Sequence, residues 1–196
     1  MLTLLALEKA KADITCAAPD IAQKHVINHM TGEEMVDDDR NVMTEASRIT
    51  RGAIQALNTI DPGEFDAIVF VGGFGVAKNL SSYAFDGPDY DVDPEVLDLI
   101  QRAHAEGKAL GFMCIAPVLA ARALGSKGVE LTIGHDADVA SALEAKGAKH
   151  IKCPVDEAVT DKANRVVSTP AYMLAQSVTD AEAGINKFVA SVLELA

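Results

Sequence analysis

The feature that most constrains this chain is a cysteine placed between a buried strand and a helix. Residues 109–113 form a short apolar run after Gly107, which is typical of a strand buried in a parallel sheet. Residues 117–124 are compatible with a helix, and Pro117 suits its first turn. Cys114 is therefore predicted at a sharp turn from strand to helix. Helix N–H groups at such a turn lower a thiol pKa and face the atom that the sulfur attacks.

Two interpretations of Cys114 follow from this position. A strand-to-helix turn exposes a nucleophile at the carboxyl edge of a sheet, as it does for the serine of many hydrolases. A free cysteine is also among the residue types most often buried, so a purely structural role is the alternative. The placement at the turn favours the reactive thiol.

Charge and composition exclude several classes of function. The chain carries 17 basic and 29 acidic residues, a net charge of -12, which argues against nucleic acid or an anionic membrane as a partner. Hydrophobic residues make up 49% of the chain, so a globular core is expected. Without an internal repeat, residues 1–196 are predicted to form a single α/β domain.

The three cysteines, Cys16, Cys114 and Cys153, are widely spaced and form no Cys-x-x-Cys pair. This spacing predicts neither a disulfide framework nor a metal site, and it fits a reducing compartment. The longest uncharged apolar run, residues 109–121, is too short to span a bilayer and contains a proline. The sequence therefore predicts a cytoplasmic protein.

The rest of the chain alternates helical and strand patterns, which predicts a doubly wound, mostly parallel sheet in three layers. Asp93 is expected to cap a helix that Pro94 opens. A turn-rich polar segment is predicted over 21–40, with a turn at 31–34. Helices are predicted over 1–11, 41–53, 94–106, 117–124, 136–146 and 174–195, with a strand as the alternative over 41–53. Strands are predicted over 13–17, 66–71, 109–113, 129–133, 150–153, 158–161 and 165–169, the last two as a hairpin.

Ligands of open α/β sheets bind beyond the carboxyl ends of the strands, where Gly72, Gly73 and Cys114 are expected. The glycines allow close approach of the backbone, and their N–H groups together with that of Ile115 would form an oxyanion hole. A tight strand-to-loop turn is the alternative reading of the two glycines. A nucleotide cradle is excluded, because the segment lacks the third glycine of the dinucleotide motif and no phosphate-binding loop is present.

His135 follows Cys114 by 21 residues, at the end of the next predicted strand. It is a candidate for the base that polarises the thiol, and an exposed loop histidine is the alternative. Asn79 and Tyr172 are placed near the same edge of the sheet. No metal ion or cofactor is predicted.

Three segments of the chain carry a family resemblance. Residues 70–80, 111–117 and 169–175 resemble the PfpI and glutamine amidotransferase-like superfamily, and within it the ElbB glyoxalases, also described as enhancing lycopene biosynthesis proteins. Residues 26–33 and 40–52 support the same match. The resemblance covers essentially the whole chain.

This resemblance implies a flavodoxin-like fold, a homodimer, and cofactor-independent conversion of a small dicarbonyl, glyoxal to glycolate, or a related protein deglycase activity. It implies Cys114 as nucleophile, with the Gly73 and Ile115 amides facing the oxyanion. The alternative is a non-catalytic redox-sensing or regulatory module linked to isoprenoid biosynthesis. An amidotransferase would need a His-x-Glu after the cysteine, and the one such motif, residues 104–106, precedes it.

The chain departs from the family pattern at its beginning. In the family a strand precedes the first helix, and a glutamate near that helix contacts the cysteine. This chain begins within the helix, and Glu8 lies too far along it to match. We therefore expect a sheet that lacks its first strand, with unpaired inner edges, and a site without the family's acid. The loss of the acid favours the non-catalytic alternative, and the resemblance does not require a histidine at position 135.

Overall fold

The computed structural model describes all of residues 1–196, which divide into two compact units. Unit 1 consists of residues 1–12 and 61–196, and unit 2 consists of residues 13–60. The prediction of one domain over residues 1–196 stays a prediction. No helix combines the length and the apolar character that crossing a bilayer would need.

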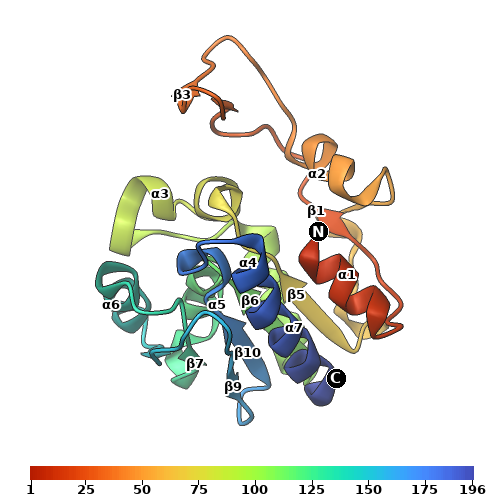
Figure 1. Ribbon diagram of the computed structural model, residues 1–196, viewed down its shortest axis with the longest axis vertical. Coiled ribbons are helices and arrows are strands. Elements are labelled where there is room, and N and C mark those ends of the chain that lie inside the picture. The colour runs from red at the N-terminus through yellow and green to blue at the C-terminus, as the bar shows by residue number, and fades with distance from the viewer. The chain divides into compact units, whose positions relative to one another are not determined.

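A four-stranded sheet forms the centre of unit 1, in the order β5-β6-β10-β9 (Figure 1). Its strands are β5 (Ala67–Phe70), β6 (Ala109–Met113), β10 (Val166–Thr169) and β9 (Val159–Asp161). β5 and β10 run parallel to β6, and β9 pairs antiparallel with β10. Every residue of β6 is buried. The strand predicted over 109–113 and the hairpin predicted over 158–169 are both confirmed.

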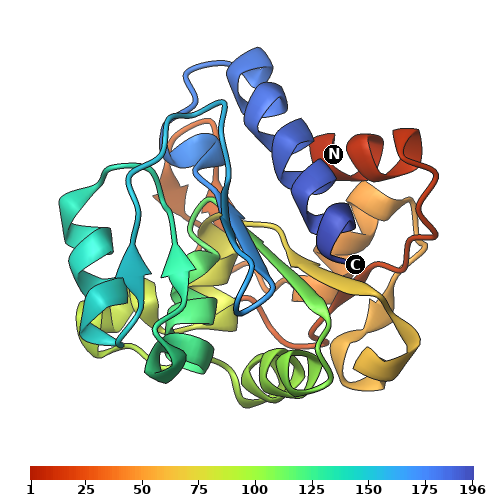
Figure 2. The ribbon, with the colours of Figure 1, turned by 90° about the horizontal axis from the view of Figure 1, so that it is seen from below.

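Helices cover both faces of this sheet, which confirms the predicted three-layer α/β class (Figure 2). On one face, a Cβ at Gly111 would lie 2.6 Å from Cζ of Phe188, so the glycine lets α7 pack directly on β6. On the other face, Phe112 stacks on Phe70 with ring centroids 5.1 Å apart. The helices are α1 (Leu2–Lys9), α3 (Tyr83–Asp86), α4 (Pro94–Ala105), α5 (Pro117–Leu124), α6 (Ala137–Ala145) and α7 (Val178–Leu195).

Side-chain caps explain where several of these helices begin. Asp93 accepts hydrogen bonds from the N–H groups at the start of α4, as the sequence predicts, and Asp136 does the same for α6. The last helix begins at Val178, because Ser177 accepts a hydrogen bond from the Asp180 N–H. The sequence predicted a start at residue 174, which instead follows a short 3₁₀ turn over Ala171–Met173.

A second pair of parallel strands, β7 (Glu130–Leu131) and β8 (Lys149–His150), is shorter than the predicted ranges. Side chains replace backbone partners on one side of this pair. Oδ2 of Asp161 accepts the Glu130 N–H at 2.9 Å, and Oγ of Ser168 accepts the Thr132 N–H at 2.9 Å. These contacts join β7 to the hairpin of β9 and β10 without extending the ladder.

β5 occupies an edge of the four-stranded sheet, since β6 is its one hydrogen-bonded partner. Its first three residues are only half-buried, although the strand is apolar throughout. β5 is therefore less covered than β6, which has a hydrogen-bonded partner on each side.

Unit 2 contains two pairs of very short strands. β1 (Ala17–Ala18) and β4 (Gln55–Ala56) are parallel, and β2 (Ile27–Asn28) and β3 (Glu33–Glu34) are antiparallel. The strand predicted over 13–17 is thus mostly irregular. The predicted turn at 31–34 is wrong in detail, because Glu33 and Glu34 pair with β2 around the preceding residues. Figure 1 shows this hairpin extending away from α2.

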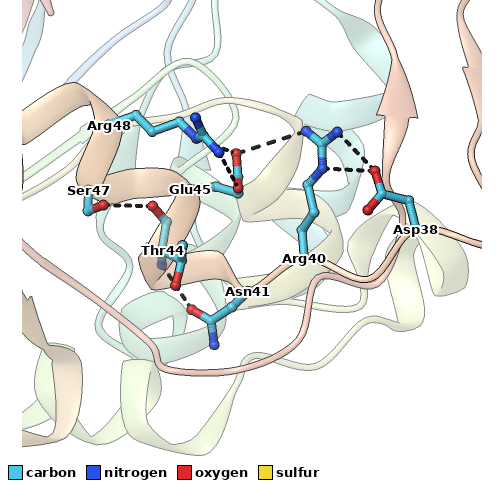
Figure 3. A network of polar contacts seen from close by, with 7 residues as sticks. All are labelled: Asp38, Arg40, Asn41, Thr44, Glu45, Ser47 and Arg48. Atoms are coloured by element: carbon cyan, nitrogen blue, oxygen red, sulfur yellow. Dashed lines mark hydrogen bonds and ion pairs between the residues drawn. The ribbon is translucent and has the colours of Figure 1, made fainter.

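Polar contacts surround α2 (Val42–Thr50), which has no buried residue (Figure 3). Oδ1 of Asn41 accepts the Thr44 N–H at 2.9 Å and caps the helix. Arg40 pairs with Asp38 at 3.0 Å and with Glu45 at 3.9 Å. Exposed pairs of this kind contribute at most about 1 kcal/mol each. Unit 2 is therefore held together by capping and surface ion pairs more than by a core.

Candidate active site

Cys114 directly follows β6, at the carboxyl edge of the sheet. Its backbone has φ 59°, and its N–H donates to the Thr169 carbonyl at 3.0 Å. A positive φ is rare for a residue with a side chain and costs energy unless the surrounding structure enforces it. Cys114 is half-buried. The predicted sharp turn between strand and helix is confirmed, and the thiol is not sealed in the core.

The neighbouring strands also lead into residues with positive φ, which is strained at Ala171 and unstrained at the glycine. Gly73, beyond β5, has φ 108°, and Ala171, beyond β10, has φ 44°. Because β5 and β10 flank β6, three adjacent strands each lead into a residue with positive φ. Such residues cluster at functional sites, where the strain is maintained by the fold. This edge of the sheet is therefore the best candidate for a site.

Gly72 lies directly against Cys114. A Cβ at Gly72 would be 2.4 Å from Cβ and 3.2 Å from Sγ of Cys114, and 2.7 Å from the Met113 carbonyl oxygen. These distances leave no room for a side chain. The structure thus brings Gly72 and Cys114 together. Position 72 is a glycine because any larger residue would collide with the cysteine.

The N–H groups of Gly73 and Ile115 flank this contact. Neither of them donates a hydrogen bond within the chain. A Cβ at Gly73 would meet nothing within 4 Å, so the backbone there is open on that side. The side chain of Ile115 is buried and anchors the turn. Both amides are available to a negatively charged oxygen, and their assignment as an oxyanion hole stays a prediction.

His135 is exposed, on the loop between β7 and α6. Burial lowers the pKa of the nearby His150, and its electrostatic interactions with Lys152 and His135 act in the same direction. β6 is hydrogen-bonded to β5 and β10, whereas β7 contacts β9 and β10. The next strand along the chain is therefore not the next strand in the sheet. The role of His135 as a base stays a prediction.

The other two cysteines differ from Cys114 in their surroundings. Burial raises the pKa of the Cys153 thiol to about 11, and the nearby Glu157 and Asp156 carboxylates raise it further. Burial also raises the pKa of Cys16. All three thiols are free, and no group of three or more potential ligand side chains could hold a metal ion.

Sequence reasoning missed several residues around this edge. Thr3 is buried in α1, and its hydroxyl donates to Sδ of Met113, the residue before Cys114, at 3.6 Å. Beyond Gly73, residues Val76–Leu80 form a π-helical turn, a conformation often found at functional sites. Lys78, which the sequence did not single out, belongs to this turn. Asn79 and Tyr172, which the sequence places at this edge, lie in the same turn and directly after Ala171. The sequence gave no signal for the π turn, whereas Thr3 stands out within a run of leucines.

Comparison with known proteins identifies close relatives, although no family model matches the chain. It is 43% identical over 201 residues to human glutamine amidotransferase-like class 1 domain-containing protein 3, covering 98% of this chain and 74% of that protein. A crystal structure of an Ehrlichia chaffeensis isoprenoid biosynthesis protein with an amidotransferase-like domain superposes with a TM-score of 0.90. The two are 31% identical, and the match covers 100% of this chain and 90% of that one.

A more remote structure shares the fold. A DJ-1 superfamily protein from Agrobacterium tumefaciens has a TM-score of 0.58 at 17% identity, over 98% of this chain and 79% of that one. This likeness and that of the Ehrlichia protein confirm the flavodoxin-like class predicted from the sequence.

These comparisons correct the predicted compartment. The human relative and the ES1 relatives from rat and zebrafish are all named as mitochondrial proteins, which contradicts the prediction of a cytoplasmic protein. The prediction rested on unpaired cysteines and the lack of an apolar span. Free thiols persist in any reducing compartment, so they could not distinguish the cytoplasm from another one.

The fold around Cys114 and the sequence relatives lead to the same family. The predicted resemblance to amidotransferase-like proteins is confirmed, and the identities of 33–43% to the curated relatives show the family. The chain belongs to the family of glutamine amidotransferase-like class 1 domain-containing protein 3 and the ES1 proteins.

Proposed function

We propose that this protein is a cofactor-independent glyoxalase of the ElbB type, with Cys114 as its nucleophile and a small dicarbonyl as its substrate. One observation carries the proposal: the half-buried Cys114 is held at φ 59° against Gly72. That arrangement holds the thiol at the carboxyl edge of the sheet, outside the sealed core. A cysteine with only a packing role would not need this strained turn.

The reaction needs no external oxidant or reductant. The Cys114 thiolate adds to one aldehyde carbon of glyoxal, and the resulting alkoxide is stabilised by the Gly73 and Ile115 N–H groups. A base removes the proton from that carbon and a proton returns to the other, which turns the hemithioacetal into a thioester. Water then cleaves the thioester, releasing glycolate and the thiol. One carbon is oxidised and its neighbour is reduced, so glyoxal plus water equals glycolic acid.

Measuring glycolate formation from glyoxal tests this proposal directly. The wild type is expected to form glycolate, Cys114→Ser to lose essentially all of this activity, and the control Cys153→Ser to retain it, because the Cys153 thiol is buried with a pKa of about 11. Absence of turnover in the wild type would refute the glyoxalase proposal and favour the alternative of a redox-sensing or regulatory module. Activity that survives Cys114→Ser would exclude Cys114 as the nucleophile.

His135 is the candidate base, and its contribution is separable from that of the thiol. His135→Asn is expected to lower turnover and to change its pH profile, because the variant lacks the group proposed to move the proton. Alkylation of Cys114 by iodoacetamide would stay measurable in this variant. An unchanged pH profile would assign the proton transfer to another group.

A further inference from the structure

A lysine and an exposed aromatic ring lie on the segment that begins at the Cys114 contact. Phe74 is two residues beyond Gly72, and its side chain is 74% exposed. The Lys78 ammonium lies over this ring, with Nζ 5.2 Å from the ring centroid. The π-helical turn over Val76–Leu80 places Lys78 back above Phe74. A cation–π contact of this kind gives a flexible ammonium a preferred position at little cost in solvation.

The charge of this ammonium is not neutralised by the protein. Lys78 forms no ion pair with any carboxylate of the chain, although the chain carries 29 acidic residues. Most of the other charges would repel an anion, since the net charge is -12. An anionic group would therefore be attracted most strongly to this unpaired lysine, which lies on the segment that begins at the contact between Gly72 and Cys114.

Apolar side chains border the same edge of the sheet. Val71 and Phe74 follow β5 and are 53% and 74% exposed, and Tyr172 follows β10 and is 55% exposed. Large apolar side chains thus stand exposed beyond the strands on both sides of β6. Glyoxal, with two carbons, has nothing to place against them.

We propose that Phe74 and Lys78 form a subsite for a carboxylate, and that the preferred substrates are α-oxoaldehydes that carry a carboxylate on an apolar body. This inference rests on the proposed function of Cys114 and names its substrate class. The aldehyde carbon meets the Cys114 thiol, the apolar body lies against the aromatic rim, and the carboxylate pairs with Lys78. Phe74 acts as a positioning residue that holds the ammonium.

Alkylation of Cys114 tests the carboxylate subsite without requiring turnover. Iodoacetate and iodoacetamide are nearly the same size and differ in charge, and mass spectrometry of the Cys114 peptide gives the rate for each. Lys78→Met is expected to lower the iodoacetate-to-iodoacetamide rate ratio about fivefold, the size of one charge acting through a high dielectric. Lys78→Arg should preserve the ratio, and Phe74→Leu should lower it partly.

Lys162→Met is the matched control. It removes the same charge from the turn between β9 and β10, at the opposite end of β10 from Thr169 and Cys114. The ratio is expected to stay at the wild-type value in this variant. A ratio unchanged in Lys78→Met, or lowered equally by Lys162→Met, would overturn the subsite.

Turnover of phenylglyoxal and 4-carboxyphenylglyoxal tests the substrate class. The wild type is expected to show a kcat/KM about fivefold or more higher for the carboxylate, and Lys78→Met to lose this preference. Equal kcat/KM values in the wild type would overturn the substrate class. Failure of every aldehyde to react would refute the proposed glyoxalase, and the alkylation ratio would still decide the subsite.

Discussion

At the scale of single residues, the site depends on Gly72. The sequence predicts the position of this glycine at the edge of the sheet, but not the reason why a glycine is needed there. Gly72 and Gly73 were predicted together as one pair, yet the structure gives them different tasks. Gly72 has no room for a Cβ against Cys114, whereas Gly73 needs a positive φ and has open space beside it. A glycine in a sequence can mean either that no side chain fits or that the backbone has a positive φ. The sequence does not show which of the two reasons applies to each of two adjacent glycines.

Gly72→Ala is the sharpest single substitution that follows. The new Cβ would lie 2.4 Å from Cβ of Cys114 and 2.7 Å from a backbone oxygen, so the turn must shift. We expect glyoxal turnover to fall at least about tenfold, and the free energy of unfolding to fall by about 1–3 kcal/mol, the usual cost of overpacking. Denaturant unfolding and glycolate formation measure the two effects.

Gly75→Ala provides the matched control on the same segment. Its Cβ would be 3.6 Å from Nδ2 of Asn79, an ordinary contact, and Gly75 has a helical backbone with φ -59°. Stability and turnover should stay close to the wild type. Wild-type turnover in Gly72→Ala would mean that the close contact with Cys114 does not matter for the chemistry.

At the scale of elements, the hairpin of β9 and β10 depends on one buried carboxylate. Oδ1 of Asp161 accepts the Asn164 N–H at 3.0 Å, and Oδ2 accepts the Glu130 N–H at 2.9 Å and the Asn164 side-chain amide at 2.7 Å. Burial alone would raise the pKa of Asp161. These hydrogen bonds outweigh burial and hold the pKa below its ordinary value of 3.8. The carboxylate form therefore stabilises the fold.

The sign of this shift predicts a pH dependence. Asp161→Asn should lower the free energy of unfolding by about 2 kcal/mol at pH 7, a typical value for buried hydrogen bonds to a charged group. The wild type loses this advantage as the pH falls from about 3.8 through the lower folded-state pKa, so the two stabilities should converge there. Asp156→Asn, which removes only an exposed pairing with Lys187, should change stability by about 0.5 kcal/mol or less. A constant difference from pH 7 to pH 3 would contradict this account.

The elements differed in how far the sequence could predict them. β6, α4, α5 and the last hairpin have strong local signals: a continuous apolar run, an Asp-Pro cap, and a turn between two apolar segments. β7 ended early because Asp161 and Ser168 accept N–H groups that a longer strand would have paired. His135 was expected beside Cys114 because its strand comes next in the chain. In the sheet, β10 takes that position, and order along the chain does not reveal it.

At the scale of the whole molecule, apolar burial is distributed unequally between the two units. Three apolar residues of unit 2 are buried, namely Ala18, Val26 and Leu57, and the rest of the buried core belongs to unit 1. Met30, Val36 and Ile49 of unit 2 are 94%, 79% and 52% exposed. The sequence showed α2 as an amphipathic pattern, and such a pattern cannot tell whether anything covers its apolar side.

This inequality predicts different local stabilities. Amide hydrogens in residues 13–60 should exchange in local openings far smaller than global unfolding, because few buried apolar contacts oppose those openings. Amides of β6 and α7 should exchange only with global unfolding, since both elements belong to the buried core of unit 1. Hydrogen exchange followed by mass spectrometry measures both sets in one experiment. Protection of residues 13–60 equal to that of β6 would show that apolar burial within unit 2 does not set its stability, and that cover from outside the unit does.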